Sequence, residues 1–235
     1  MSSWTPFTGD NRDDDTRLLL AEGAAALGID LDERQLRLFA AYEEEILKWN
    51  RIVSLVAVKS PLDIPIKHFL DSLTVLPLLP SPGGRLLDIG TGGGFPGLPL
   101  KIARPELDLY LLETARKKVS FLKETTRILG LTGVTVVHDR VERLMRDGSM
   151  ASSCDTVISR AAFQPPELLA MGAHFLRPGG LLVIMRGPRE EAGAAMREVL
   201  AVQTGLQLER KELLRLPVTG ERRIIYLYRK PPAEG

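Results

Sequence analysis

The sequence predicts an α/β fold in which a central, mostly parallel sheet of seven strands follows a helical N-terminal region. After Gly84, short apolar runs alternate with segments of helical periodicity, which is the pattern of parallel strands joined by crossover helices. Before Gly84 the periodicity is helical only. The last two strand-like runs follow each other directly, as the strands of an antiparallel pair do.

Composition places the chain among ordinary globular proteins. The 235 residues are 44% apolar and 26% charged, and the formal net charge of +1 gives no global attraction to nucleic acid or to anionic membranes. The first residues are polar and acidic, unlike a signal peptide, and apolar runs such as LLVIM are too short to span a bilayer. With a single cysteine, Cys154, we expect a cytoplasmic protein with no membrane contact and no metal site.

Three helices are expected in the N-terminal region. Residues 1–15 are poor in apolar side chains and are expected to be disordered. Helical periodicity then predicts helices over 16–27, 32–50 and 65–79, the first of them ended by Gly28. We therefore divide the chain into a helical region, 1–84, and an α/β domain, 85–235.

The α/β domain begins with the apolar run that ends in Asp88. Apolar or alternating runs predict strands at 85–90, 107–113, 134–139, 154–160, 181–187, 206–217 and 222–230. Helical patterns predict helices at 95–105, 115–130, 165–176 and 188–203, the first with its prolines in the first turn, where they are tolerated.

A glycine-rich segment, DIGTGGGFPGLPL, follows the first strand. Glycines in a strand-to-helix turn indicate positive φ angles or the close approach of another group. Asp88, Gly90, Gly92 and Gly94 match the acid-glycine pattern of S-adenosylmethionine-dependent methyltransferases, whereas Gly92, Gly94 and Gly97 match the dinucleotide fingerprint. A tight turn without a ligand is the third interpretation.

Charge favours the methyl donor. A carboxylate at Asp88 repels a pyrophosphate but attracts the sulfonium and ammonium groups of S-adenosylmethionine. Glu113 ends the second strand, about 20 residues after the loop, where a carboxylate holds ribose hydroxyls in nucleoside-binding sheets. An acid placed ahead of a helix N-terminus is the structural alternative for Glu113.

These residues resemble the bacterial 16S ribosomal RNA guanine-N7 methyltransferases, also called glucose-inhibited division protein B. The resemblance covers about residues 30–230. It implies a Rossmann-like class I methyltransferase fold with S-adenosylmethionine as cofactor. The matching motifs are KWN (48–50), HFLDSL (68–73), LLDIGTGGGFPGLPLKIARPE (86–106), LLETARKKVSFL (111–122), VVHDRVE (136–142), ISRA (158–161) and PVTGERR (217–223).

The resemblance also implies roles for individual residues. Glu113 would hold the ribose, Val141 and Glu142 the adenine edge, and Arg160 would lie between cofactor and substrate. The expected cofactor-binding residues are Asp88, Gly90, Gly92, Phe95, Glu113, Val141, Glu142 and Arg160.

Arginines are the expected substrate-positioning residues. Arg140, Arg160 and Arg186 all follow predicted strands, so we expect them to cluster at one edge of the sheet. Guanine N7 has a free lone pair and no proton, so Arg160 and Arg140 would align the substrate and no general base is needed. His68, Arg140 and Arg186 are expected to face the RNA, and a structural pair of His68 with Asp71 is the alternative.

The sequence departs from the family pattern at three places. Relatives usually have Asn-Leu-Thr where this chain has Ser54-Leu55-Val56, and Lys-Gly where it has Arg186-Gly187. They usually have Glu-Arg-His where this chain has Glu221-Arg222-Arg223. A guanidinium and an ammonium differ in geometry, so the roles of these positions are not transferred.

The expected partner is 16S rRNA within the small ribosomal subunit or an assembly intermediate, bound by a monomer. The near-neutral charge favours local recognition or a pre-formed ribonucleoprotein over naked RNA. Three alternatives remain: an assembly factor without catalysis, a small-molecule or protein methyltransferase, and a dinucleotide oxidoreductase.

Overall fold

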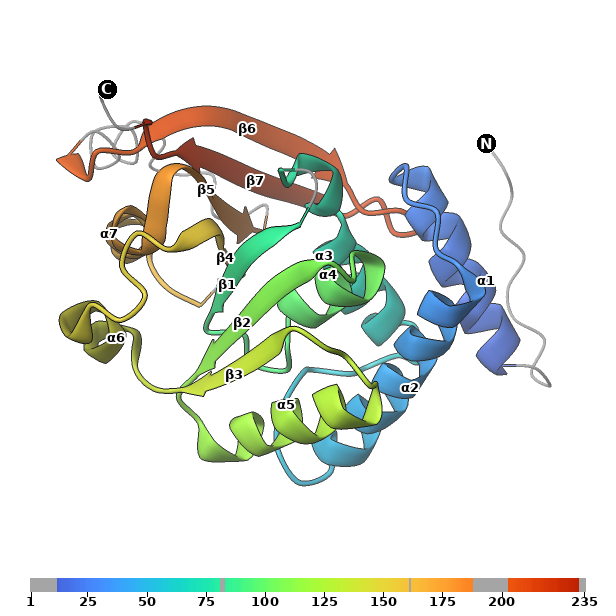
Figure 1. The fold of residues 1–235 in the computed structure, drawn as a ribbon. Helices are drawn as coiled ribbons and strands as arrows, with labels where there is room; N and C mark the ends of the chain where they lie inside the picture. The colour runs from blue at the N-terminus through green and yellow to red at the C-terminus, as the bar shows by residue number, and fades with distance from the viewer. Residues whose placement is uncertain (1–11, 81–82, 161, 188–202, 233–235) are drawn as a thin grey trace.

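The computed structural model describes residues 12–80, 83–160, 162–187 and 203–232, which form one α/β unit around a seven-stranded sheet (Figure 1). The strand order is β3-β2-β1-β4-β5-β7-β6; β1 to β5 are parallel, and β7 runs antiparallel to β5 and β6. The predicted fold class is therefore confirmed. The strands are β1 (Gly84–Ile89), β2 (Leu107–Glu113), β3 (Val134–His138), β4 (Cys154–Arg160), β5 (Leu176–Arg186), β6 (Gln207–Arg215) and β7 (Arg222–Arg229).

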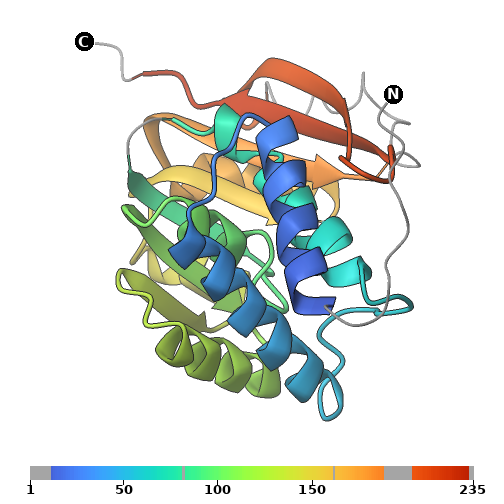
Figure 2. The same ribbon diagram turned by 90° about the vertical axis from the view of Figure 1, so that its right-hand side faces the viewer.

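Helices cover both faces of the sheet, as parallel strands require. Figure 2 shows two long N-terminal helices lying in front of one face, and Figure 1 shows the last two helices beside the other. The first face carries α1 (Arg12–Ala26), α2 (Glu33–Asn50), α3 (Asp71–Leu73), α4 (Gly97–Ala103) and α5 (Arg116–Ile128). The second face carries α6 (Val141–Asp147), which the sequence did not predict, and α7 (Pro165–Phe175).

Helix α2 matches its prediction because its start is chemically specified. The Asp32 side chain accepts a hydrogen bond from the Gln35 amide, and the Gln35 side chain accepts one from the Asp32 amide. Such a capping box satisfies amides that have no partner within the helix and is worth about 1 kcal/mol. The apolar side of α2, including Phe39, Tyr42 and Ile46, is fully buried.

The third predicted helix is not continuous. Residues 65–79 form a π-helical turn (Pro65–Leu70), the short α3 and a 3₁₀ turn (Leu76–Leu78). Pro77 lacks an N–H and cannot extend an α-helical ladder. The Thr74 hydroxyl also donates to the Asp71 carbonyl, one of the side-chain bonds that compete with helical pairing.

The N-terminal helices share their core with the sheet. Leu19 of α1 and Phe39 of α2 belong to the same buried cluster as Leu86 of β1 and Leu109 of β2. Helix α1 begins at Arg12, so the expected disorder of residues 1–15 is wrong for the last four of them. The remaining eleven, and nearly all of the helix expected over 188–203, lie outside the described residues.

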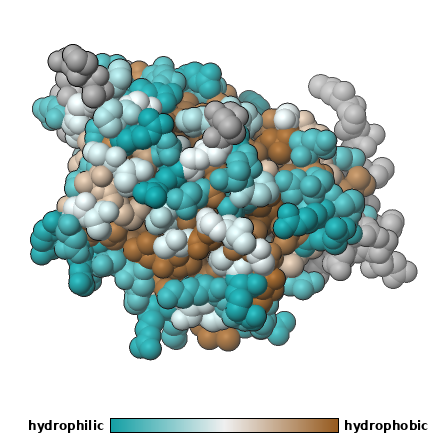
Figure 3. Space-filling model, viewed as in Figure 1, coloured by the Kyte–Doolittle hydropathy of each residue, from teal (hydrophilic) through white to brown (hydrophobic). Residues whose placement is uncertain are grey.

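Large apolar side chains lie mainly inside the protein. On the face shown in Figure 3, hydrophilic residues cover most of the surface and leave smaller hydrophobic areas between them. Within the described residues, no helix is both long and apolar enough to cross a membrane.

Candidate functional site at the carboxyl ends of the strands

The glycine loop lies where the strand order reverses. From β1 the chain continues to β2 and β3 on one side, while β4 and β5 lie on the other. In open α/β sheets, ligands bind beyond the carboxyl ends of the strands at this switch point. The loop is tied to β2 because the amides of Gly90 and Thr91 both donate to the Leu112 carbonyl.

The glycines of the loop serve different purposes. Gly90, Gly92 and Gly94 all have positive φ angles. A Cβ at Gly90 would lie 2.7 Å from the Cβ of Ala162, and one at Gly94 would lie 2.6 Å from the hydroxyl of Tyr42. A Cβ at Gly92 would meet no atom within 4 Å. The close neighbours of Gly90 and Gly94 are thus side chains of this chain, and the loop is open at Gly92.

Asp88 lies beneath the loop and joins its two ends. The side chain is fully buried, and its Oδ2 accepts from the Thr91 hydroxyl at 2.6 Å and from the Gly97 amide at 2.9 Å. Its Oδ1 is buried without a hydrogen-bond partner among the described residues. Burial raises the pKa of Asp88 to about 6. The carboxylate therefore builds the loop, and one of its oxygens is buried without a hydrogen bond to any described residue.

Glu113 supports the loop from the end of β2. Its Oε2 accepts from the Gly92 amide at 3.0 Å, and its Oε1 accepts from the amides of Thr114 and Ala115 at 2.8 Å, just ahead of α5. The Thr114 hydroxyl also lies 3.4 Å from Oε1, so three donors face this oxygen, while Oε2 receives only the Gly92 amide. Since each carboxylate oxygen has about two acceptor positions, Oε2 keeps one for a ligand hydroxyl, and the two roles expected for this acid are compatible.

The two acids fit a cationic nucleoside ligand. Neither Asp88 nor Glu113 forms an ion pair within the part of the chain that the structure describes. Beside the effect of burial, the charge of Arg160 lowers the pKa of Asp88, and that of Glu113 raises it to a smaller extent. Both carboxylates would attract a cation bound at the loop, Asp88 through space because its side chain is fully buried. The residues present thus fit S-adenosylmethionine, which carries a sulfonium, an ammonium and ribose hydroxyls.

Arg160 connects the loop to the N-terminal helices. From the end of β4, its Nη1 donates to Oδ2 of Asp71 at 3.1 Å and to the Lys67 carbonyl at 3.2 Å, and its Nη2 lies 3.1 Å from Nδ1 of His68. The guanidinium also lies 5.0 Å from the ring centre of Phe95 in the loop. Arg160 thus contacts both the expected cofactor loop and the π-helical turn.

His68 is a neutral acceptor in this arrangement. Burial, and then the charge of Arg160, lower the pKa of His68 to about 3. Because a guanidinium only donates, Nδ1 accepts and the proton sits on Nε2. The alternative pair of His68 with Asp71 does not form; both side chains bind Arg160 instead.

A cationic cavity of about 450 Å³ opens next to Arg160. It lies between the π-helical turn, α3, the ends of β4 and β5, and the start of β7. Among the residues that the structure describes, its charged lining comprises Lys67, Arg160, Arg186 and Arg223 together with the carboxylate of Asp71. This surplus of positive charge suits an anionic substrate.

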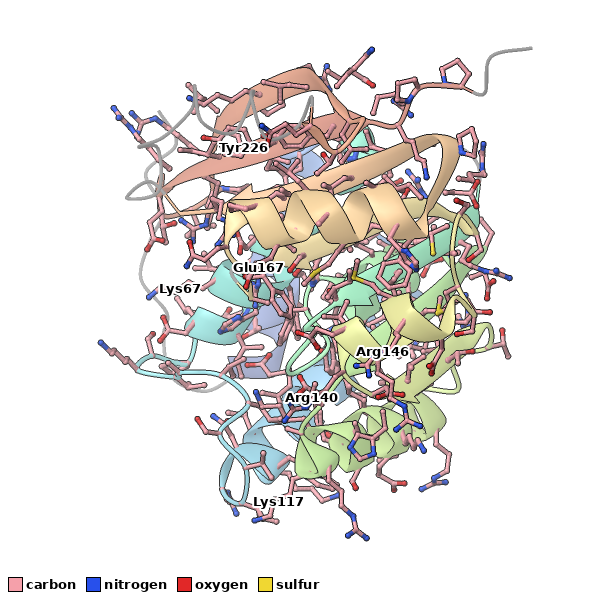
Figure 4. All side chains as sticks on the ribbon, turned by 90° about the vertical axis from the view of Figure 1, so that its left-hand side faces the viewer. Lys67, Lys117, Arg140, Arg146, Glu167 and Tyr226 are labelled. Carbon is pink, nitrogen blue, oxygen red and sulfur yellow. The ribbon has the colours of Figure 1, made fainter. Side chains whose placement is uncertain are left out.

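The expected clustering of three arginines is only partly correct. Arg186 is buried, donates to the Phe163 carbonyl and lines the cavity with Arg160. Arg140 is exposed at the start of α6 and is not part of the described lining. All three strands end at one edge, but two strands separate β3 from β4, a distance of about 14 Å. Figure 4 shows Arg140 on the same face as Lys67 but apart from it.

Three other expected cofactor residues have defined surroundings. Val141 is buried in the core on the second face, and Glu142 is exposed in the first turn of α6. The Phe95 ring is buried against Tyr42 and His68 as well as Arg160. Tyr42, which the sequence did not single out, donates its hydroxyl to the Gly93 carbonyl, and burial raises the pKa of this hydroxyl well above its usual value.

Comparison with known proteins identifies the family to which the sequence is similar. The model of the family described as rRNA small subunit methyltransferase G matches residues 35–225. A ribosomal RNA small subunit methyltransferase G of Syntrophus aciditrophicus is 42% identical over 213 residues, 90% of this chain and 88% of the relative. One from Geobacter sp. strain M21 is 42% identical over 207 residues, 87% of this chain and 93% of the relative.

Solved structures of methyltransferases share the fold of this chain at low sequence identity. A SAM-dependent methyltransferase from Aquifex aeolicus aligns with a TM-score of 0.55 at 17% identity, covering 80% of this chain and 98% of that one. TYW2 of M. jannaschii, in complex with AdoMet, aligns with a TM-score of 0.51 at 17% identity, covering 63% and 69%. At this identity they establish a shared architecture only.

Proposed function

Because this chain belongs to the rRNA small subunit methyltransferase G family, we propose that it methylates N7 of a guanosine in 16S rRNA. Membership makes the chain an S-adenosylmethionine-dependent rRNA methyltransferase; the choice of the N7 atom is the proposal. The observation that carries it is the pairing of an acidic glycine loop with a cationic cavity across Arg160.

The cofactor belongs at the acidic side of this arrangement. Glu113 would accept from the ribose, the open face of Gly92 would lie against the nucleoside, and Asp88 would favour the cationic end. Val141 and Glu142, at the start of α6, are the residues assigned to the adenine edge. When bound, S-adenosylmethionine supplies a methyl group on a positively charged sulfur.

The target guanine belongs at the cationic side. Arg160 uses three of its five N–H groups within the protein, so two can reach acceptors on the base or on a phosphate. His68 does not act as a base, because Arg160 occupies the lone pair on Nδ1. This suits N7, which gives up no proton when it is methylated, so alignment is the main task of the protein.

RNA contacts extend around the cavity. We assign Arg186 to its wall and Arg140 to a more distant contact with the RNA backbone, with His68 holding Arg160 from behind. Since the net charge is only +1, we place the substrate in a small ribosomal subunit or an assembly intermediate, bound by a cytoplasmic monomer.

A methylation assay tests this function. Purified small subunits and naked 16S rRNA, each from cells without the enzyme, are incubated with protein and S-adenosylmethionine, and nucleosides are identified by mass spectrometry. We expect N7-methylguanosine from the subunits. Its absence from both substrates would refute the proposal, and methylation at another atom would refute the assignment of N7.

Cofactor titration separates the remaining alternatives. Calorimetry is expected to show binding of S-adenosylmethionine and none of NAD. Binding to small subunits without any cofactor binding would identify a non-catalytic assembly factor. Methylation of free guanine nucleotides at a rate equal to that of subunits would instead favour a small-molecule methyltransferase.

A further inference from the structure

A buried carboxylate joins two arginines that come from two different strands of the α/β domain. Asp71, only 5% exposed, accepts from Nη1 of Arg160 through Oδ2 at 3.1 Å and from Nε of Arg223 through Oδ1 at 2.8 Å. Arg160 ends β4, whereas Arg223 lies at the start of β7. Each oxygen of the carboxylate therefore serves a different guanidinium.

We propose that Arg223 is a positioning residue that holds Arg160, through Asp71, against Phe95 at the wall of the cationic cavity. The inference rests on the proposed function, because it concerns the geometry in which Arg160 meets the target base.

The bonds of Arg223 are those of a supporting residue. All three of its nitrogens donate within the protein: Nε to Asp71, Nη1 to the Arg222 carbonyl at 2.9 Å, and Nη2 to Oε2 of Glu221 at 3.0 Å. Like Arg160, it uses three of its five N–H groups, but here each of the three nitrogens is anchored, so the side chain is held in one orientation. Only 16% of the Arg223 side chain is exposed.

Two partners fix the carboxylate more firmly than one. With Arg160 alone, Asp71 could rotate about its side-chain bonds, and Arg160 would follow. With Arg223 on the second oxygen, the carboxylate plane is set by β7, which is hydrogen-bonded along its length between β5 and β6. Arg160 transmits this geometry to the cofactor loop through its contact with the Phe95 ring, 5.0 Å away.

The first test replaces Arg223→Gln and compares it with Arg222→Gln. Arg222 is exposed and adjacent, so its replacement removes the same charge from outside the network. Because a displacement of about 1 Å can cost up to about 100-fold in rate, we expect R223Q to lower kcat on small subunits about tenfold. KM for subunits and Kd for the cofactor should change less than about twofold, and R222Q should leave kcat unchanged.

A different kinetic pattern would overturn the inference. If R223Q raised KM and left kcat unchanged, Arg223 would be an RNA contact and not a positioning residue. If R223Q and R222Q behaved alike, the ion pair with Asp71 would have no effect on the reaction.

A second variant, Arg223→His, gives a pH profile that a merely structural role would not produce. Titratable and charged groups from several elements face this position: Asp71 on α3, Lys67 and His68 on the π-helical turn, Arg160 on β4, Arg186 on β5, and Glu221 beside it. The imidazole is cationic below its pKa, ordinarily about 6.5, and neutral above it.

R223H should therefore have nearly the kcat of the wild type at about pH 6 and approach that of R223Q at about pH 8.5. In the wild type, the arginine stays charged and His68 stays neutral throughout this range. Asp88, whose pKa is about 6, titrates in every variant, so each kcat is compared with that of the wild type at the same pH, and the ratio for R223Q should not change with pH. Equal kcat values for R223H and R223Q at both pH values would contradict the inference.

A measurement without substrate separates this inference from the proposed function. In arginine-labelled protein, the Nη protons of Arg160, assigned by their loss in Arg160→Lys, should exchange slowly in the wild type and in R222Q. They should exchange at least about tenfold faster in R223Q. If the wild type methylated no RNA but showed this coupling, only the proposed function would fail. If it methylated RNA and exchange did not change in R223Q, only the positioning role would fail.

Discussion

The glycine loop and the cationic cavity meet at Arg160, yet they differ in charge and in origin. The loop site comes from one stretch of sequence, between Asp88 at the end of β1 and Glu113 at the end of β2, and its side chains are acidic. The cavity collects cations from the π-helical turn and from the ends or start of three strands. The loop site suits a cationic methyl donor, and the cavity suits a polyanion.

This difference separates binding of the cofactor from positioning of the substrate. The charge of Asp88, beneath the loop, costs stability when no cation is present, since burial disfavours the ionised carboxylate. Arginines next to the cavity are already paired, through Asp71 and backbone carbonyls, before any RNA arrives. The loop site is thus completed by its ligand, whereas the cavity is organised by the protein.

The largest effect is expected on the cavity side. Arg160→Ala removes the group that joins both sites and should lower kcat on small subunits by about 100-fold to 1,000-fold. The Kd for S-adenosylmethionine, measured by calorimetry, should change less than about threefold. Arg140→Ala is the comparison, because its exposed side chain should affect KM and not kcat. Equal losses of kcat in the two variants would remove the distinction between these arginines.

The pH dependence of stability tests the loop side. The folded-state pKa of Asp88, about 6, lies above the ordinary value of 3.8, so the folded protein holds this proton more tightly than the unfolded chain. Without cofactor, this group should lower the free energy of unfolding by about 2 kcal/mol as the pH rises from about 4 to 7. Denaturant titrations of the wild type and Asp88→Asn measure it. The difference in the free energy of unfolding between the two proteins should vanish at about pH 4. A difference that does not change with pH would contradict the raised pKa of Asp88.

A change at Glu113 should affect cofactor binding and leave kcat nearly unchanged, the opposite of the effect expected at Arg160. Glu113→Gln removes a charge that faces the cofactor, so we expect its Kd to rise about 30-fold, from the loss of one charge-assisted hydrogen bond. At saturating cofactor, kcat should stay within about threefold of the wild type. Calorimetry and steady-state rates together measure this split. A large fall in kcat at saturation would show that the loop site also positions the substrate.

The smallest effect distinguishes two glycines of the same loop. Gly90→Ala and Gly92→Ala both introduce a side chain at positive φ, which costs about 1 kcal/mol, but only the first meets the Cβ of Ala162. We expect G90A to lower the melting temperature several degrees more than G92A. G92A should instead weaken cofactor binding, because its methyl group enters the open side of the loop. The opposite ranking in both assays would reverse the roles assigned to these glycines.

Sequence patterns were most accurate where local chemistry specifies the element. The capping box at Asp32 fixed the start of α2, and alternating side chains predicted the terminal pair β6 and β7. The pattern failed at residues 65–79, because helical spacing of apolar residues does not reveal where Pro77 and side-chain hydrogen bonds interrupt the ladder. It also missed α6, a helix of seven residues, which is too short for a clear period.

The residues of the candidate site also divide into those that the local sequence predicts and those that only the fold brings together. By itself the sequence determined the acidic glycine loop, the acid at the end of the second strand and the α/β order, since each depends on neighbours along the chain. Only the tertiary structure decided that Asp71 joins Arg160 to Arg223 and that Arg140 stands apart, because strand order in the sheet brings distant residues together. A linear pattern shows which strand an arginine follows, but not which strands lie beside it.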